Sequence, residues 1–143
     1  MILYLNASAL IKLYVAEEGS AAVRQAVNSA MESSSCLITY AEVCAALARA
    51  QRMLRLPESD HRYQLECFAK DWNKIQAIGV DMALVRRAGE LSGQFSLRGY
   101  DSVHLAAAER AFEAAGRPEA FRFVAFDGRL RAGAAALGMH VLD

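Results

Sequence analysis

Four side chains that carry oxygen ligands lie at the starts of predicted helices: Asn6, Glu42, Asp101 and Asp127. Asn6, Glu42 and Asp127 each follow a short segment that predicts a buried strand. In an open parallel α/β sheet such positions share the carboxyl edge, where ligands bind. Carboxylates gathered there repel each other unless a cation neutralises them, and oxygen ligands without His or Cys suit Mg²⁺ or Mn²⁺. We therefore predict that the four side chains converge on a divalent cation, with Asn6 as a neutral amide where a carboxylate is favoured.

Helix capping is the simpler interpretation of each residue taken singly. Asn6 and Asp127 suit N-cap positions, where a side-chain oxygen accepts a backbone N–H. Thr39 and Glu42 have the spacing of a capping box, in which Glu42 accepts the Thr39 N–H. Asp101 lies in the first turn of its predicted helix, near the positive end of the dipole. A shared sheet edge favours the cation site over four unrelated caps.

Short apolar segments alternate with longer amphipathic ones along the chain. Strands are predicted at residues 2–5, 36–38, 77–80, 122–126 and 139–142. Helices are predicted at residues 7–15, 20–31, 39–54, 58–76, 81–95, 100–115 and 128–137. Strands that alternate with helices form a parallel sheet covered on both faces. We expect one α/β domain over residues 1–143, with a sheet of about five strands.

The composition fits a single domain and narrows the class of protein. The 143 residues hold 16 basic and 16 acidic side chains, so net charge argues neither for nor against a nucleic-acid partner. A hydrophobic share of 55% suffices for a full core and an apolar interface, and we predict a homodimer. We find no signal peptide or membrane span, and the three cysteines lack metal-ligand spacing. We therefore expect a cytoplasmic protein with small, buried, reduced cysteines.

Four segments occur in the order of a known family: MILYLNASALIKLYVAEEGS at residues 1–20, ITYAEVCAALAR at 38–49, LRGYDSVHLAAA at 97–108 and FVAFDGRL at 123–130. In these segments the chain resembles PIN-domain ribonucleases, and specifically the VapC toxins of bacterial toxin–antitoxin pairs. The resemblance implies a PIN-like three-layer α/β/α sandwich. It also implies that Glu42, Asp101 and Asp127 are acidic site residues, and that Asn6 occupies the first acidic position of the family pattern. Ser8 corresponds to the hydroxyl that supports this position.

The resemblance further implies an endoribonuclease. Mg²⁺ or Mn²⁺ lowers the pKa of a bound water, and the resulting hydroxide attacks a phosphorus of the RNA backbone. Asn6 departs from the family pattern, so we expect an inactive or weakened enzyme. The alternative is a non-catalytic module of the same fold that binds an antitoxin or RNA. A phospho-receiver domain or a haloacid-dehalogenase-like phosphatase is disfavoured, because Asn6 stands where a nucleophilic Asp is required and no lysine follows Lys74.

The resemblance also implies an RNA substrate and a VapB-like antitoxin as partners. Four basic residues are candidates for binding substrate phosphates, with solvated surface charge as the alternative: Lys12, Arg98, Arg129 and Arg131. Tyr63, Phe68 and Trp72 follow helical spacing and are expected in the core, or else in a groove for an antitoxin helix. We expect His104, which shares a helix face with Asp101, to be packed or hydrogen-bonded rather than a metal ligand.

Overall fold

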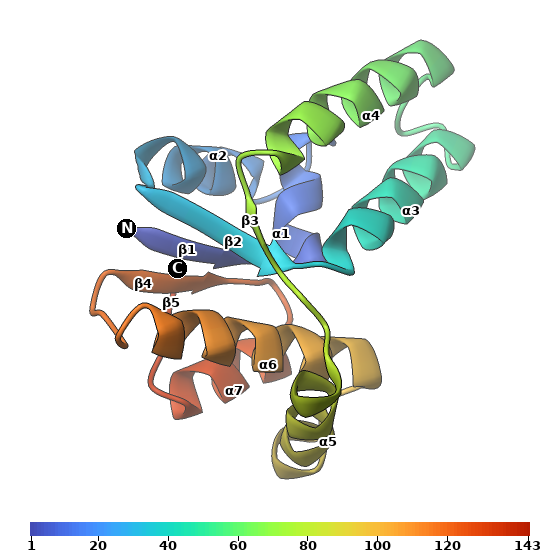
Figure 1. The fold of residues 1–143 in the computed structure, drawn as a ribbon. Coiled ribbons are helices and arrows are strands. Elements are labelled where there is room, and N and C mark those ends of the chain that lie inside the picture. Colours follow the sequence, from blue (N-terminus) through green and yellow to red (C-terminus); the bar gives the residue numbers. More distant parts are fainter.

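The computed structural model, which describes all residues 1–143, shows a chain built around a parallel sheet of five strands (Figure 1). The strands are β1 (Ile2–Leu5), β2 (Glu32–Cys36), β3 (Gln76–Ile78), β4 (Phe121–Val124) and β5 (His140–Val141). They lie in the order β3-β2-β1-β4-β5, and every neighbouring pair is parallel. β1 is therefore the central strand, and its carboxyl end lies between those of β2 and β4.

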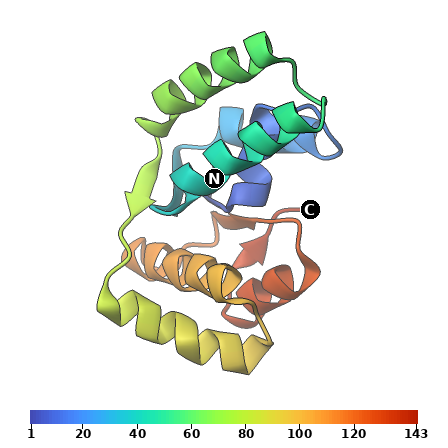
Figure 2. The same cartoon turned by 90° about the vertical axis from the view of Figure 1, so that its right-hand side faces the viewer.

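Helices cover both faces of this sheet (Figure 1, Figure 2). They are α1 (Ala7–Leu10), α2 (Ser20–Ser29), α3 (Thr39–Arg52), α4 (Glu58–Trp72), α5 (Met82–Phe95), α6 (Gly99–Ala114) and α7 (Gly128–Ala136). A 3₁₀ helix, η1 (Ile11–Leu13), continues α1. Helices α1 to α4 pack on one face and α5 to α7 on the other, which confirms the predicted three-layer α/β/α sandwich.

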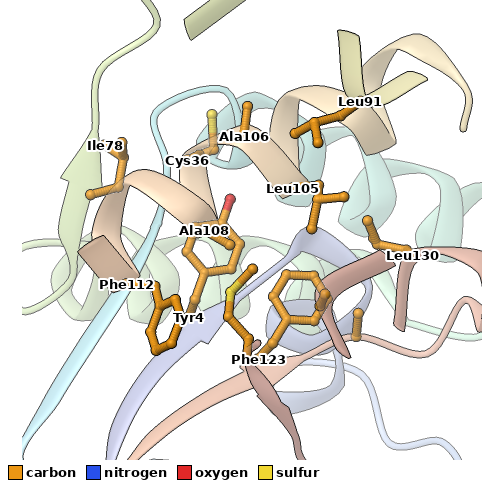
Figure 3. Close-up of a cluster of buried hydrophobic side chains, with 14 of the residues drawn as sticks. Tyr4, Cys36, Ile78, Leu91, Leu105, Ala106, Ala108, Phe112, Phe123 and Leu130 are labelled. Carbon is orange, nitrogen blue, oxygen red and sulfur yellow. The ribbon is translucent and has the colours of Figure 1, made fainter. Parts of the chain in front are cut away.

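The central strand supplies side chains to two separate cores, because successive residues of a strand point to opposite faces. Leu3 and Leu5 are fully buried on the side of α1 to α4. Tyr4 is fully buried on the other side, where its ring stacks on that of Phe123 with centroids 5.7 Å apart (Figure 3). Three alanines of α6, residues 106–108, line this second core, and their small side chains let the helix lie close to the sheet.

The second strand begins earlier than the sequence predicts. A strand was predicted at residues 36–38, but β2 runs over Glu32–Cys36 and includes the three serines at residues 33–35. Ser34 and Ser35 are buried, and their hydroxyls satisfy carbonyl groups of β1: Ser34 Oγ donates to the Leu3 oxygen over 3.0 Å, and Ser35 Oγ lies 2.5 Å from that of Leu5. Tertiary hydrogen bonds therefore make a polar segment fit a central position in the sheet.

The predicted capping box at the start of α3 is wrong. The N-cap residue is Ile38, which has no side-chain cap, and the Glu42 carboxylate bonds His104 instead of the Thr39 N–H. Thr39 is buried, and its Oγ1 lies 2.8 Å from Ser35 Oγ. The other boundaries differ from the predicted ones by a few residues at most. The largest of these differences is at α4, which ends at Trp72 rather than at residue 76.

Several side chains lie elsewhere than expected. Phe68 is fully buried and Trp72 packs beside it with ring centroids 5.7 Å apart, but Tyr63 is 63% exposed and is not a core residue. All three cysteines are free thiols, and only Cys36 is buried, since Cys44 and Cys67 are half-buried. None of the helices has the length and apolar character needed to span a membrane.

Candidate functional site

The carboxyl edge of the sheet brings Asn6 and Asp127 to the ends of neighbouring strands. β1 and β4 pair with Leu5 opposite Val124, and the Asn6 N–H donates to the Val124 carbonyl over 3.1 Å. Asn6 follows β1 directly and caps α1, whereas Asp127 follows β4 and caps α7. Both predicted caps are confirmed. Asn6 is buried and Asp127 is exposed, so the edge offers one enclosed and one open polar group.

The side-chain oxygen of Asn6 is already used twice. Its Oδ1 accepts the Ala9 N–H over 3.1 Å and the Ser8 hydroxyl over 2.7 Å. An amide oxygen has two lone pairs, so these two donors occupy both of them. Nδ2, a donor that repels cations, is the part of the amide with no hydrogen-bond partner in the chain. A carboxylate at this position would instead keep a second oxygen free while the first capped the helix.

Asp127 shows how such a carboxylate is held. Its Oδ1 accepts the Leu130 N–H over 3.0 Å, which leaves Oδ2 for a ligand. Phe126, the preceding residue, packs under the Lys12 ammonium, which lies 4.4 Å from the ring centroid. The ring also contacts Gly19, whose φ is +89° and where an added Cβ would lie 2.9 Å from Phe126 Cε1. The loop before α2 is thus packed directly against the residue that precedes Asp127.

Glu42 is held by side chains rather than by backbone. Its Oε1 lies 2.6 Å from His104 Nε2, and His104 Nδ1 lies 2.9 Å from the hydroxyl of Tyr4. His104 is only 2% exposed, which confirms a buried and hydrogen-bonded histidine. Complete burial raises the pKa of the Tyr4 phenol well above its usual value, so the hydroxyl stays protonated. Burial also raises the pKa of the neighbouring Cys36 thiol, which therefore stays neutral.

Sequence reasoning missed the contact between Glu42 and His104. The spacing of Asp101 and His104 places both on one face of α6 but does not indicate a partner on α3. The sequence did hold a signal for the bond between Tyr4 and His104, because a tyrosine buried in the central strand needs a hydrogen-bond partner and His104 is the polar residue among the alanines of α6. It held no signal for the bond between His104 and Glu42, which depends on how α3 and α6 are arranged around the sheet.

Glu42 and Asp101 border the same pocket, which has a volume of about 760 Å³. Asp101 is partly exposed at the start of α6, and its Oδ2 lies 3.3 Å from Arg98 Nε. Arg98 also borders the pocket and is 86% exposed, so its charge remains available to a ligand. Tyr100, between the two, exposes 72% of its surface to the same space. Two carboxylates, one guanidinium group and one aromatic ring therefore line the same pocket.

These residues fit a hard divalent cation in chemical type, but they do not form a complete metal site. Glu42, Asp101 and Asp127 supply carboxylate oxygens, the ligands that Mg²⁺ and Mn²⁺ prefer. No group of three or more His, Cys, Asp or Glu side chains lies close enough to hold a metal ion. At position 6, Asn6 offers an oxygen that is already bonded twice. The convergence of all four residues on one cation stays a prediction, with position 6 as its weakest ligand.

The basic residues differ in how free they are to bind phosphate. The Lys12 ammonium donates to Glu17 Oε1 over 3.0 Å and to the Glu18 carbonyl over 2.7 Å, and its side chain is only 12% exposed. Arg131 Nη1 donates to the Ala125 carbonyl over 3.1 Å and to the Leu142 carbonyl over 3.0 Å. This guanidinium therefore links the segments that follow β4 and β5. Arg129 is exposed and lies 3.4 Å from the Ser96 carbonyl. Arg98 and Arg129 are the more accessible pair.

Comparison with known proteins relates the chain to one family. The PIN domain family matches residues 3–136. Among curated proteins, the chain is 34% identical over 140 residues to Ribonuclease VapC45 of Mycobacterium tuberculosis (strain CDC 1551 / Oshkosh). It has the same identity to Ribonuclease VapC49 of strain ATCC 25618 / H37Rv, and each match covers 98% of this chain and 94% of the relative. Ribonuclease VapC46 of the latter strain is 32% identical over 140 residues, covering 98% of this chain and 95% of the relative.

A solved structure shares the fold. A toxin–antitoxin complex from Klebsiella pneumoniae contains a chain that matches this one with a TM-score of 0.65 and 16% sequence identity. The match covers 100% of this chain and 97% of the other. At this identity the likeness concerns the arrangement of helices and strands, which agrees with the family match.

Proposed function

The chain belongs to the PIN-domain family, and on this premise we propose that it is a VapC-type toxin, a Mg²⁺- or Mn²⁺-dependent endoribonuclease whose activity is weakened by Asn6. PIN-domain ribonucleases generally use a divalent metal. The relatives are ribonucleases by name, and they match nearly the whole chain. RNA is accordingly the proposed substrate, and hydrolysis of its phosphodiester bonds the proposed reaction.

One observation carries the proposal, which is the position of Asn6. It ends the central strand, beside the end of β4 and Asp127, and its side-chain oxygen accepts the Ser8 hydroxyl. The family pattern has Asp at this point, followed at the second position by Ser or Thr. A neutral amide therefore occupies the centre of an otherwise acidic edge, with the supporting hydroxyl in contact. This combination supports a ribonuclease scaffold that lacks one of its charges.

The residues divide the work of RNA cleavage as follows. Glu42, Asp101 and Asp127, with the side chain at position 6, would hold the cation, which when bound activates water and offsets charge on the phosphate. Arg98 is exposed at the pocket and binds a phosphate of the substrate backbone. Arg129, which is also exposed, would bind a further phosphate of the RNA. Tyr100 presents an exposed ring on which an unpaired base stacks.

Asn6 weakens cation binding for two reasons. The edge keeps three formal negative charges instead of four, so the Coulomb attraction for a divalent ion falls. The amide oxygen is also engaged by Ser8 and Ala9, and the free end of the amide is a hydrogen-bond donor. Coordination by Asn6 would require at least one of these hydrogen bonds to break.

The same observation favours a second candidate, a non-catalytic PIN-fold module that binds an antitoxin or RNA. In this second candidate, the Asn6 amide serves only as the cap of α1, and the exposed Arg98 and Tyr100 bind RNA without cleavage. The two candidates predict the same fold and the same surface. They differ in whether a carboxylate at position 6 produces hydrolysis.

The proposed protein partners are a VapB-like antitoxin and a second copy of the chain. Exposed apolar side chains at the end of α3 and on α4 provide surface for such contacts, namely Met53, Leu54 and Tyr63. We propose that the antitoxin docks over the helices rather than over the sheet edges, since the strands are short and the helices cover the sheet. Light scattering that gives a monomer of about 15.6 kDa at high concentration would reject the homodimer.

The test of the proposed function is single-turnover cleavage of structured RNA with Mg²⁺. We compare the unmodified chain, Asn6→Asp, and Asn6→Asp combined with Asp101→Asn. We expect Asn6→Asp to cleave at least about a hundredfold faster than either of the other two proteins, which corresponds to about 2.8 kcal/mol of barrier. Equal cleavage by the first two proteins would show that position 6 is a cap alone. If a broad RNA panel yields no cleavage by any folded variant, the binding-module candidate is favoured.

A further inference from the structure

We propose that His104 is a positioning residue for Glu42: the buried Tyr4 hydroxyl holds His104 in its Nε2–H tautomer, and this N–H fixes one carboxylate oxygen of Glu42 so that the other faces the site. The inference rests on the proposed function in taking Glu42 as a site residue. It extends that function by assigning a role to two buried residues, His104 and Tyr4, that supply no oxygen to the cation.

The geometry is a chain of two hydrogen bonds across three elements. Tyr4 lies in β1, His104 in α6 and Glu42 in α3. The hydroxyl of Tyr4 is 2.9 Å from Nδ1 of the imidazole, and Nε2 on the opposite side of the ring is 2.6 Å from Glu42 Oε1. Both contacts join residues far apart in sequence, so they exist only because the fold closes around them.

The direction of each hydrogen bond follows from the groups themselves. An ionised carboxylate only accepts, so Nε2 carries the proton that bonds Glu42. A neutral imidazole has a single N–H, which leaves Nδ1 as an acceptor. Tyr4 is fully buried, burial favours its neutral phenol, and this phenol is the donor that Nδ1 requires. The three groups therefore form one consistent sequence of donors and acceptors, from the Tyr4 hydroxyl through the imidazole to the Glu42 carboxylate.

Packing fixes the orientation of the ring. Tyr4 stacks on Phe123 with an angle of 5° between the rings, and His104 meets Tyr4 edge-on with an angle of 74°. His104 is 2% exposed, so neither ring has room to turn. A histidine held in this way can orient the partly exposed carboxylate side chain that it bonds.

Glu42 needs such a support because its carboxylate forms no other hydrogen bond within the chain. The expected bond to the Thr39 N–H is not formed, and the Glu42 side chain is 32% exposed at the edge of the pocket. A glutamate has three rotatable side-chain bonds, and a free one would occupy many rotamers. Oε1 is bonded to His104, and Glu42 lines the pocket that Asp101 also lines, so Oε2 is the oxygen left for a ligand there.

The first experiment measures the tautomer in the unmodified protein by ¹⁵N NMR of the histidine rings near neutral pH. We expect Nε2 of His104 to be protonated and Nδ1 to be unprotonated. His61 and His140 serve as internal references, and the His104 signals are identified as those that persist when the other signals are lost in His61→Gln and His140→Gln. A predominant Nδ1–H tautomer, or a doubly protonated ring, would overturn the proposal. This measurement involves neither metal nor activity, so it stands even if the proposed function fails.

The second experiment uses two amides that imitate different ends of the imidazole. The amide nitrogen of Gln reaches the position of Nε2, whereas that of Asn reaches only that of Nδ1. In an Asn6→Asp background, we expect His104→Gln to keep the Mn²⁺ affinity within about twofold, and His104→Asn to lower it about tenfold, or about 1.4 kcal/mol. Thermal unfolding establishes that both variants are folded.

The outcomes separate positioning from structure and from the proposed function. Equal losses in the two variants would indicate a purely structural histidine, and no loss in either would show that Glu42 needs no support; each result overturns the proposal. Failure of Asn6→Asp itself to bind Mn²⁺ would contradict the proposed function, and the tautomer measurement then decides the role of His104 alone. The same measurement decides if neither amide variant folds.

Discussion

Two halves of the sheet edge hold their polar side chains in different ways. Asn6 and Asp127 bond the backbone of the helices that they begin, to Ala9 and Leu130 respectively. Glu42 is held by His104, a side chain 62 residues away, while the carboxylate of Asp101 contacts only the exposed Arg98. The first half is thus built by local backbone geometry, and the second by side-chain contacts between helices that lie on opposite faces of the sheet.

The difference explains how position 6 accommodates an amide. Asn and Asp cap helices about equally well, because each offers one oxygen to a backbone N–H. The exchange therefore changes the charge of the site while the fold is preserved. At Glu42 the same exchange would act on a side-chain network, where the donor and acceptor at each atom are fixed. Variants at the two halves test this contrast.

The largest effect is expected for Asn6→Asp on metal affinity. The change adds a fourth negative charge and frees a second oxygen, so we expect Mn²⁺ to bind about a hundredfold more tightly, or about 2.8 kcal/mol. In the absence of metal the melting temperature should fall slightly, because the cap is kept but the added carboxylate is repelled by the neighbouring ones. Calorimetric titration measures the affinity, with Asn6→Ser, a capping residue without charge, as the control. Equal affinity of the chain before and after Asn6→Asp would contradict the charge argument.

A smaller effect is expected for Tyr4→Phe, which acts on the other half. The ring keeps its stacking on Phe123, but His104 Nδ1 loses its buried donor. Leaving a buried acceptor unsatisfied costs about 1–3 kcal/mol, and we expect a loss near the middle of this range in urea unfolding. Phe123→Leu, which removes the stacked ring and leaves the hydroxyl, provides the comparison. Unchanged stability of Tyr4→Phe would mean that water reaches His104.

Residues at the helix starts should contribute less to the free energy of unfolding than the Tyr4 hydroxyl does. Asn6→Ala removes the acceptor of the Ala9 N–H and should lower the free energy of unfolding by about 1 kcal/mol. Asp101→Ala, in which no backbone hydrogen bond is lost, should cost only about 0.5 kcal/mol through the helix dipole. Denaturant unfolding of both variants measures the difference. Equal losses would erase the distinction between backbone-held and side-chain-held residues.

The smallest effect is expected for Arg98→Ala, because this side chain is 86% exposed and its ion pair with Asp101 is weak. Stability should change by less than about 0.5 kcal/mol. RNA binding should weaken about threefold, and the salt dependence should fall by about one unit of slope. Arg131→Ala is the control for a bonded guanidinium, since it should lower stability more than RNA affinity. If Arg131→Ala weakened RNA binding more than Arg98→Ala did, Arg131 rather than Arg98 would be the phosphate-binding residue.

The sequence by itself determined the fold and the backbone-held half of the site. Apolar segments of strand length and amphipathic segments of helix length recur along the chain, and their alternation permits a parallel sheet with helices on both faces. Asn6 and Asp127 were predicted as caps because an N-cap is a local matter of one side chain and the next few backbone amides. Their common edge also followed, since the carboxyl ends of parallel strands share one edge, whereas the pairing of β1 with β4 is known only from the structure.

Only the tertiary structure decided how the remaining side chains are held. Ser34 and Ser35 lie in a strand because their hydroxyls bond β1, which residue type alone does not reveal. Glu42 was assigned to Thr39, its nearest local donor, but a histidine on another helix lies closer to its carboxylate. Short-range rules name the partners available within a turn of helix. The choice between those and a partner 62 residues away depends on how α3 and α6 pack around the sheet, and that is a property of the whole fold.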